Sequence, residues 1–67
     1  MDDLAIAALR KRVGGRVRVQ SAQGRLVSLS LISVDGEGFS CYVLDDPDYD
    51  PSLPYWWSFD EILAVCP

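Results

Sequence analysis

The feature that most constrains the fold is a run of alternating apolar and polar residues from Arg16 to Leu44. Successive side chains of a β-strand point to opposite faces of a sheet, so a period of two residues predicts strands with one buried face. Two glycine-bearing turns, at residues 21–24 and 35–38, divide the run into three strands. The pattern predicts a strongly bent antiparallel meander, which is typical of a small β-barrel.

The strand pattern continues beyond this run, so that five short strands are expected in all. In the first strand the two valines are expected to point inward and the two arginines outward. The second strand changes phase at Ile32, which predicts a bend or bulge at a corner of the sheet. The expected strands lie at residues 16–20, 25–34, 39–44, 55–59 and 62–66, with a single 3₁₀ turn at residues 60–61.

An amphipathic helix is predicted ahead of the strands, at about residues 3–13. Asp2 and Asp3 place carboxylates at its start, cations fill its last turn, and Gly14-Gly15 stops it. Its apolar face consists of Ile6, Leu9 and Val13, widened by Leu4 and Ala5. We expect this face to close over an open end of the barrel; an amphipathic helix on a membrane surface is the alternative.

The length of 67 residues predicts a single domain, residues 1–67, and 49% hydrophobic residues are too many for a disordered chain. No apolar run approaches the roughly 20 residues that span a bilayer, and the stretch from Leu4 to Leu9 is too short and too acidic at its front for a signal peptide. We therefore expect a soluble cytoplasmic protein that does not bind membranes. The Met1 start and the lack of a linker favour a complete small protein.

Residues 16–66 resemble two families of small β-barrel. The first half of an Sm-like motif is similar to Val17-x-Val19, Gly24-Arg25, Leu31 and Val34-Asp35. The close of SH3-like barrels, such as the C-terminal domain of ribosome maturation factors, is similar to Ser58-Phe59-Asp60-Glu61-Ile62-x-x-Val65. The resemblance implies a mainly β fold, in which an N-terminal helix precedes a five-stranded, strongly bent antiparallel SH3-like or Sm-like barrel.

The Sm-like resemblance also implies RNA as a candidate partner. Sm-like proteins read RNA partly through an Asp and an Asn around the second turn. Asp35 matches the Asp, whereas Phe39 stands where the Asn is expected, and the Arg-Gly pair of the second Sm signature is missing. Asp35 is therefore a candidate RNA-binding residue without its usual companions.

Charge is segregated along the chain. All six basic residues lie within residues 10–25, and eight of the ten acids follow Val34. The formal net charge is −4 at pH 7, whereas dedicated nucleic-acid domains are usually basic. The basic stretch either contacts phosphates or is solvated and paired with the protein's own acids. Together with Asp35, the residues of this alternative nucleic-acid site are Arg10, Lys11, Arg12, Arg16, Arg18 and Arg25.

The densest aromatic cluster, Tyr55-Trp56-Trp57, follows an acidic loop at residues 45–54. Alternation along a strand means that the two tryptophans cannot both point inward. An outward Trp beside acids suits stacking on a proline-rich or basic peptide, caging a methylated cation, or contact with a second copy. The alternative is that this ring lies under the helix or the loop. The predicted protein-binding residues are Tyr49, Tyr55, Trp56, Trp57, Asp46, Asp48 and Asp50.

The acidic loop also has the D-x-D-x-D spacing of a calcium loop, but the match ends there. Pro51 replaces the glycine that the sharp turn needs, and Trp57 stands at the position of the bidentate Glu. The chain has no His, and Cys41 and Cys66 are not a CxxC pair, so a zinc site is not expected. We interpret the two cysteines as reduced thiols that pack as small apolar groups, and we expect no metal and no cofactor.

Catalysis is not expected either, because without His a Cys or Ser nucleophile lacks its usual base and no phosphate-cradling glycine loop is present. The sequence therefore favours a non-catalytic binding module that captures an unidentified protein through exposed aromatics and the acidic loop. The alternatives are an RNA-associated Sm-like protein that uses residues 10–25, and a structural subunit of a homo-oligomer whose edge strands pair.

Overall fold

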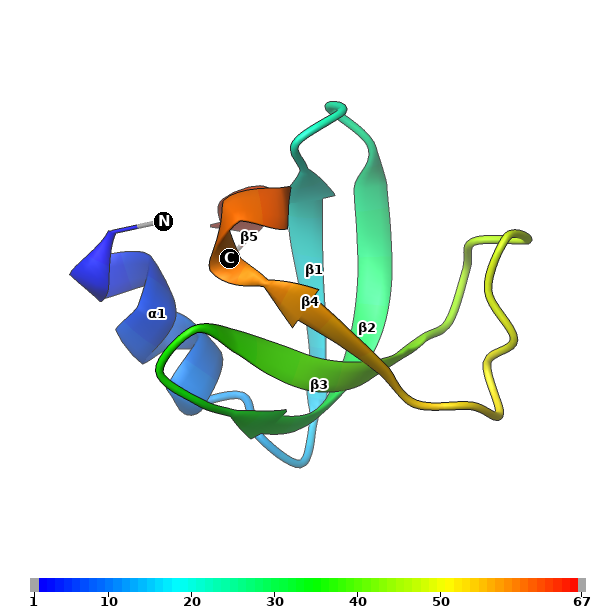
Figure 1. Ribbon diagram of the computed structural model, residues 1–67, viewed down its shortest axis with the longest axis horizontal. Helices are drawn as coiled ribbons and strands as arrows, with labels where there is room; N and C mark the ends of the chain where they lie inside the picture. The colour runs from blue at the N-terminus through cyan, green and yellow to red at the C-terminus, as the bar shows by residue number, and fades with distance from the viewer. Residues whose placement is uncertain (1, 67) are drawn as a thin grey trace.

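The computed structural model describes residues 2–66, which form one helix followed by a five-stranded antiparallel sheet (Figure 1). The strand order is β4-β3-β2-β1-β5, so β4 and β5 are the two edges. The elements are α1 (Asp3–Arg10), β1 (Arg16–Ser21), β2 (Leu26–Val34), β3 (Gly38–Val43), β4 (Tyr55–Ser58), the 3₁₀ turn η1 (Phe59–Glu61) and β5 (Ile62–Cys66). The expected mainly β fold with an N-terminal helix is confirmed, whereas the sheet of the described residues is open and does not close into a barrel.

The sheet bends within β2, where the sequence predicts a change of phase. The pairing of β2 with β3 shifts register between Leu31 and Ser33, so Ile32 has no partner and its side chain is turned out with 39% of its surface exposed. A bulge of this kind increases the local twist of a strand. In Figure 1, β3 and β4 accordingly run at a steep angle to β1 and the first half of β2.

The core lies on the concave side of this bent sheet and is built by alternation along β1, β2 and β3. Phe39, Leu29 and Val19 are fully buried there, each next to an exposed or half-buried polar residue. Burying a large apolar side chain stabilises a fold by about 1.5–3 kcal/mol. The core residues are Leu9, Val17, Val19, Val27, Leu29, Leu31, Phe39, Cys41, Val43, Trp57, Phe59 and Ile62.

The helix is shorter than the predicted residues 3–13, because the backbone after it pairs with β2. The Asp2 side chain caps its start by accepting a hydrogen bond from the Ala5 N–H at 2.8 Å. After Arg10 the chain turns: the Gly14 N–H donates to the Leu31 carbonyl, and the Leu31 N–H donates to the Gly15 carbonyl, both at 2.9 Å. These bonds hold residues 14–15 against the sheet and end the helix early.

The early end of α1 also changes its apolar face. Leu9 is fully buried and Ile6 packs against the core, as expected, but Leu4 and Val13 are 83% and 47% exposed. Val13 lies beyond the helix, so the helical spacing that placed it on this face does not apply to it. Within residues 2–66 no helix has the length and apolar character needed to cross a membrane.

Candidate functional site

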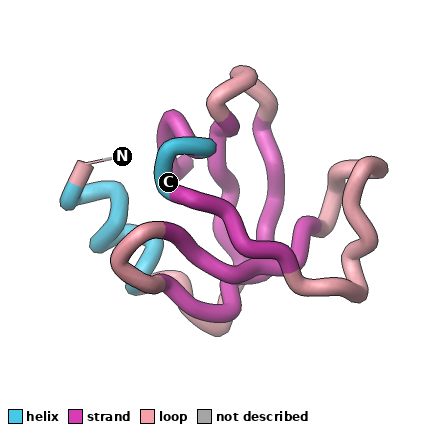
Figure 2. The backbone as a smooth tube through the Cα atoms, in the orientation of Figure 1, coloured by secondary structure: helices cyan, strands magenta, loops and turns pink. Residues whose placement is uncertain are grey.

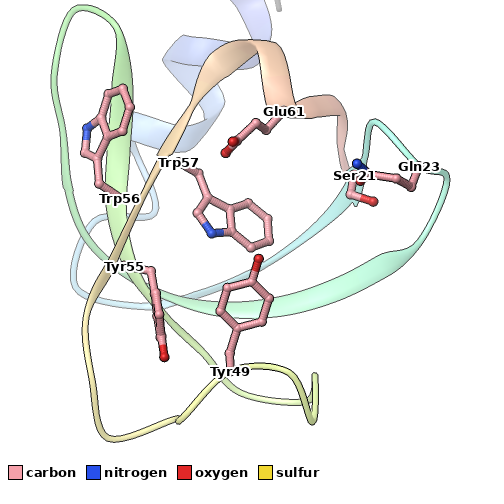
Figure 3. A pocket seen from close by; sticks show the side chains of 7 residues that line it. All are labelled: Ser21, Gln23, Tyr49, Tyr55, Trp56, Trp57 and Glu61. Carbon is pink, nitrogen blue, oxygen red and sulfur yellow. The ribbon is translucent and has the colours of Figure 1, made fainter.

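A concave surface lies between the β1–β2 turn, the acidic loop and the β4–η1 connection (Figure 3). It consists of two adjoining hollows of about 250 Å³ and 430 Å³ that share Ser21, Gln23, Tyr49 and Trp57. Figure 2 shows the acidic loop, residues 45–54, as a long loop that extends beyond the sheet. Asp46, Asp48 and Tyr49 of this loop line one side of the surface. We call it the aromatic cleft; its lining is completed by Tyr55, Trp56 and Glu61 in the first hollow and by Arg25, Val27, Asp46 and Asp48 in the second.

Three aromatic rings form the floor of the cleft. The Tyr49 ring meets the Tyr55 ring edge-on, with 4.8 Å between centroids, and it meets the Trp57 ring at 5.7 Å. Both geometries fall in the favourable range for aromatic pairs. Trp57 is only 7% exposed, whereas Tyr49 and Tyr55 are half-buried. The two tyrosines therefore offer the accessible surface, and the buried Trp57 ring packs against Tyr49.

The Tyr55 side chain also fixes the far end of the acidic loop. Its hydroxyl accepts a hydrogen bond from the Asp50 N–H at 3.2 Å. The Asp50 carboxylate in turn accepts from the Ser52 hydroxyl at 2.6 Å and from the Ser52 N–H at 2.9 Å, and these two bonds lower the pKa of Asp50. Asp50 thus holds the turn of the loop, with its carboxylate directed to Ser52.

Asp46 has a supporting position rather than an accessible one. It is 8% exposed, and its Oδ2 lies 3.2 Å from Nη2 of Arg25. Its Oδ1 accepts a hydrogen bond from the Asp48 N–H at 2.9 Å, and its carbonyl accepts from the Tyr49 N–H at 3.1 Å. Asp46 therefore anchors the loop to the β1–β2 turn and positions Tyr49 in the cleft.

Two carboxylates remain free to face a ligand. The Asp48 side chain is 78% exposed and lies 3.9 Å from Nη1 of Arg25, a weak surface contact. Glu61 extends from η1 over Trp57, opposite the β1–β2 turn, as Figure 3 shows. The sequence did not indicate Glu61, because its place depends on a long-range bond in which the Ala22 N–H donates to the Glu61 carbonyl at 2.8 Å.

The Tyr49 phenol lies within the electrostatic influence of several carboxylates of the cleft. Burial raises the pKa of Tyr49 most, and the charges of Asp46, Glu61 and Asp48 raise it further, followed by Cys41. Three carboxylates from two separate segments thus act on one hydroxyl. A cationic ligand group placed there would be favoured by the same field.

Trp56 lies on the other side of β4 from Trp57, as the alternation of the strand predicts (Figure 3). It is 50% exposed, and its Nε1–H donates a hydrogen bond to Oδ2 of Asp35 at 2.9 Å. Its ring covers Gly38 so closely that a Cβ there would come within 2.5 Å of the ring. The outward tryptophan is therefore held against the β2–β3 turn.

Asp35, the residue that matches the Sm-like motif, uses both carboxylate oxygens within this turn. Its Oδ1 accepts from the N–H groups of Glu37 and Gly38, each at 2.7 Å, while Oδ2 accepts from Trp56. The Trp56 hydrogen bond and then the two backbone bonds lower the pKa of Asp35, with a smaller contribution from the charge of Arg10. Asp35 is placed to shape the turn and to hold Trp56.

Neither the acidic loop nor the cysteines form a metal-binding cluster in the part of the chain that the structure describes. Asp46, Asp48 and Asp50 do not converge, because the first is directed to Arg25 and the last to Ser52. Cys41 is fully buried in the core, and this burial raises the pKa of its thiol to about 11. Cys41 is therefore a protonated core residue at neutral pH.

The predicted basic residues do not form a single site. Arg25 pairs with the acidic loop, and Arg10 lies at the end of α1 with its charge acting on Asp35. Lys11 follows α1 and is exposed. The remaining three, Arg12, Arg16 and Arg18, line a separate hollow on the outer side of the sheet.

Comparison with known proteins does not assign this chain to a family. No match was found among protein-family models, curated proteins or solved structures.

Proposed function

We propose that this protein is a non-catalytic binding module that holds an extended, basic peptide segment in the aromatic cleft. The observation that carries the proposal is the combination of accessible Tyr49 and Tyr55 rings with the carboxylates of Glu61 and Asp48 at the edges of the same cleft. Aromatic grooves of this kind dock proline-rich segments, whose extended conformation costs little entropy to fix. Acidic edges add a preference for Lys or Arg.

The size and support of the cleft agree with this function. Its hollows of about 250 Å³ and 430 Å³ suit a few side chains rather than a whole folded domain. The Tyr49 ring packs against the Trp57 ring and meets the Tyr55 ring edge-on. Its backbone N–H donates a hydrogen bond to the Asp46 carbonyl. A preorganised ring surface loses little freedom on binding, which favours affinity.

The same proposal includes the finer description of the fold as an SH3-like barrel that stays open between its edge strands. In support, the sheet is strongly bent at the β2 bulge, and η1 connects the edge strands β4 and β5 directly. This connection brings Glu61 to the cleft beside the β1–β2 turn.

The experiment is a titration with a short peptide that alternates proline and arginine, followed by two-dimensional NMR. We expect the Tyr49, Tyr55 and Trp57 resonances to shift, and we expect no shifts with a peptide in which glutamate replaces every arginine. Shifts that are the same for both peptides, or that lie outside the cleft, would overturn the proposal.

Two matched variants distinguish the effect of a carboxylate in the cleft from the effect of the protein's net charge. Glu61→Gln should weaken binding of the arginine peptide by up to about fivefold, the range expected of one exposed ion pair. Asp60→Asn removes the same charge from the neighbouring exposed residue, which does not line the cleft, and should leave the affinity unchanged. Equal effects of the two variants would show that the cleft does not select the cation.

A further inference from the structure

The strands themselves carry no acidic residue. All ten acids of the chain lie in α1, the loops, the turns and η1, whereas Arg16 and Arg18 lie within β1. Because Val17 and Val19 point into the core, these two arginines point to the outer side of the sheet. They are two residues apart on one face, which separates them by about 7 Å along the strand.

The register of the sheet places an aromatic ring in the same row. Arg16 on β1 is paired with Ser30 on β2, and Ser30 is paired with Tyr42 on β3. Tyr42 is half-buried, so part of this residue is accessible. The next row pairs Arg18 with Ser28, whose carbonyl accepts the Leu44 N–H at 2.9 Å. Arginines, hydroxyls and one tyrosine thus share a continuous outer surface.

A hollow of about 320 Å³ lies on this surface, and within residues 2–66 its arginines form no ion pair. It is lined by Arg12, Arg16, Arg18, Val17, Ser28 and Leu44, none of which lines the aromatic cleft. Arg25 is the one basic residue that forms an ion pair within residues 2–66. We call the surface formed by Arg12, Arg16, Arg18, Ser28, Ser30 and Tyr42 the arginine face.

The exposed arginines favour one class of anionic partner over another. Ion pairs between exposed arginines and a folded acidic protein contribute little, because they are screened and cost side-chain entropy. A polyphosphate chain adds the release of condensed counterions for every phosphate neutralised. An accessible ring adds stacking on an unpaired base, which a duplex does not offer. The combination therefore favours a single-stranded nucleic acid.

The net charge of −4 does not prevent this contact. The molecule measures 29 × 24 × 20 Å, and the Debye length is about 10 Å at 0.1 M salt, so charges on the far side are largely screened. One acid does lie at the rim: Oδ1 of Asp45 accepts the Ser28 N–H at 2.9 Å. Removing the charge of Asp45 should therefore strengthen binding of an anionic ligand.

We propose that the arginine face binds the sugar-phosphate backbone of a single-stranded nucleic acid through Arg12, Arg16 and Arg18, with Tyr42 stacked on one base. This site is independent of the aromatic cleft. Three neutralised phosphates predict a slope of log affinity against log salt of about −2, or an affinity loss of about 20-fold between about 50 and 200 mM salt.

The test is fluorescence anisotropy with a labelled single-stranded RNA of mixed sequence, titrated with the full chain at several salt concentrations. Arg16→Gln with Arg18→Gln should reduce the slope to about −0.7, and Arg16→Lys with Arg18→Lys should keep it. Arg25→Gln removes a cation that is paired with the acidic loop, and it should leave the slope unchanged. Asp45→Asn should raise the affinity, because it removes the rim charge and keeps an acceptor for Ser28.

The stacking part has its own variants. Tyr42→Ala should weaken binding about tenfold at every salt concentration without changing the slope, and Tyr42→Phe should bind as the wild type does. Absence of binding at about 50 mM salt, or equal slopes for the wild type and the double Gln variant, would overturn the proposal. So would salt-sensitive self-association, measured by light scattering without RNA, that the double Gln variant abolishes, since the face would then bind a second copy.

Discussion

The aromatic cleft and the arginine face lie on opposite sides of one bent sheet, and they use charge in opposite ways. In the cleft region two carboxylates are engaged within the fold, since Asp46 pairs with Arg25 and Asp50 caps a turn, whereas those of Asp48 and Glu61 are accessible. On the arginine face the guanidinium groups of Arg12, Arg16 and Arg18 form no ion pair within the described residues. The contrast shows that only some charged side chains maintain the structure, as Asp46 and Asp50 do, whereas the three arginines form no ion pair within the described residues.

Gly38, at the start of β3, is packed against both Trp56 and Trp57 of β4. Its substitution therefore has the largest expected effect on stability. A Cβ there would clash with the Trp57 carbonyl oxygen and come within 2.5 Å of the Trp56 ring. We expect Gly38→Ala to destabilise the protein by about 3 kcal/mol, because backbone and a hydrogen-bonded ring must move apart. Urea unfolding followed by Trp fluorescence measures this loss.

The control is Gly36→Ala in the same turn, where a Cβ would meet nothing within 4 Å and φ is not positive. Its effect should stay within about 0.5 kcal/mol. If the two alanine variants were equally stable, the close packing of Trp56 on the β2–β3 turn would be refuted, and with it the placement of the two tryptophans on opposite sides of β4.

The acids of the cleft region should divide into supporting and accessible residues. Asp46→Asn removes the ionic partner of Arg25 at a position only 8% exposed, and we expect a loss of about 1 kcal/mol in unfolding free energy. Asp48→Asn, at an exposed side chain, should change stability by less than about 0.5 kcal/mol. Thermal or urea unfolding compares the two variants directly. A larger loss of stability in Asp48→Asn would show that Asp48, and not Asp46, supports the fold.

How far the sequence could predict this arrangement depends on whether a feature is local. The strands, the bulge near Ile32 and the opposite orientations of Trp56 and Trp57 follow from alternation, and the structure confirms them. The end of the helix did not follow, because the bonds of residues 14–15 to Leu31 are long-range. The position of Glu61 at the cleft could not be predicted either, because it depends on a long-range hydrogen bond from the Ala22 N–H to the Glu61 carbonyl.

The D-x-D-x-D repeat illustrates this limit most clearly. Asp46, Asp48 and Asp50 are equivalent in spacing, yet one is buried, one is free and one caps a turn. What distinguishes Asp46 is its burial and its shorter distance to Arg25, which the fold brings to it from the β1–β2 turn. A pattern of identical residues therefore predicts an acidic loop but not which of its carboxylates can meet a ligand.

The Asp35–Trp56 contact predicts a pH dependence at the β2–β3 turn. The pKa of Asp35 is lowered from 3.8, so its charged form stabilises the fold above about pH 4, and this stabilisation is lost as the pH falls through the lowered pKa. NMR should show the Trp56 indole N–H resonance shifting in this acidic range as its acceptor is protonated. Asp35→Asn should abolish that shift, and a Trp56 resonance that is constant with pH in the wild type would contradict the contact.

The smallest change in unfolding free energy is expected for substitutions on the arginine face. Arg16→Gln combined with Arg18→Gln removes two exposed charges that form no ion pair within residues 2–66, so the unfolding free energy should change by no more than about 0.5 kcal/mol. Urea unfolding at low and high salt measures it. A loss comparable to that of Asp46→Asn would mean that these arginines hold the fold together. A negligible loss, together with reduced RNA binding, would mean that β1 carries them for a ligand, since exposed charges that contribute nothing to stability are free to be used in recognition.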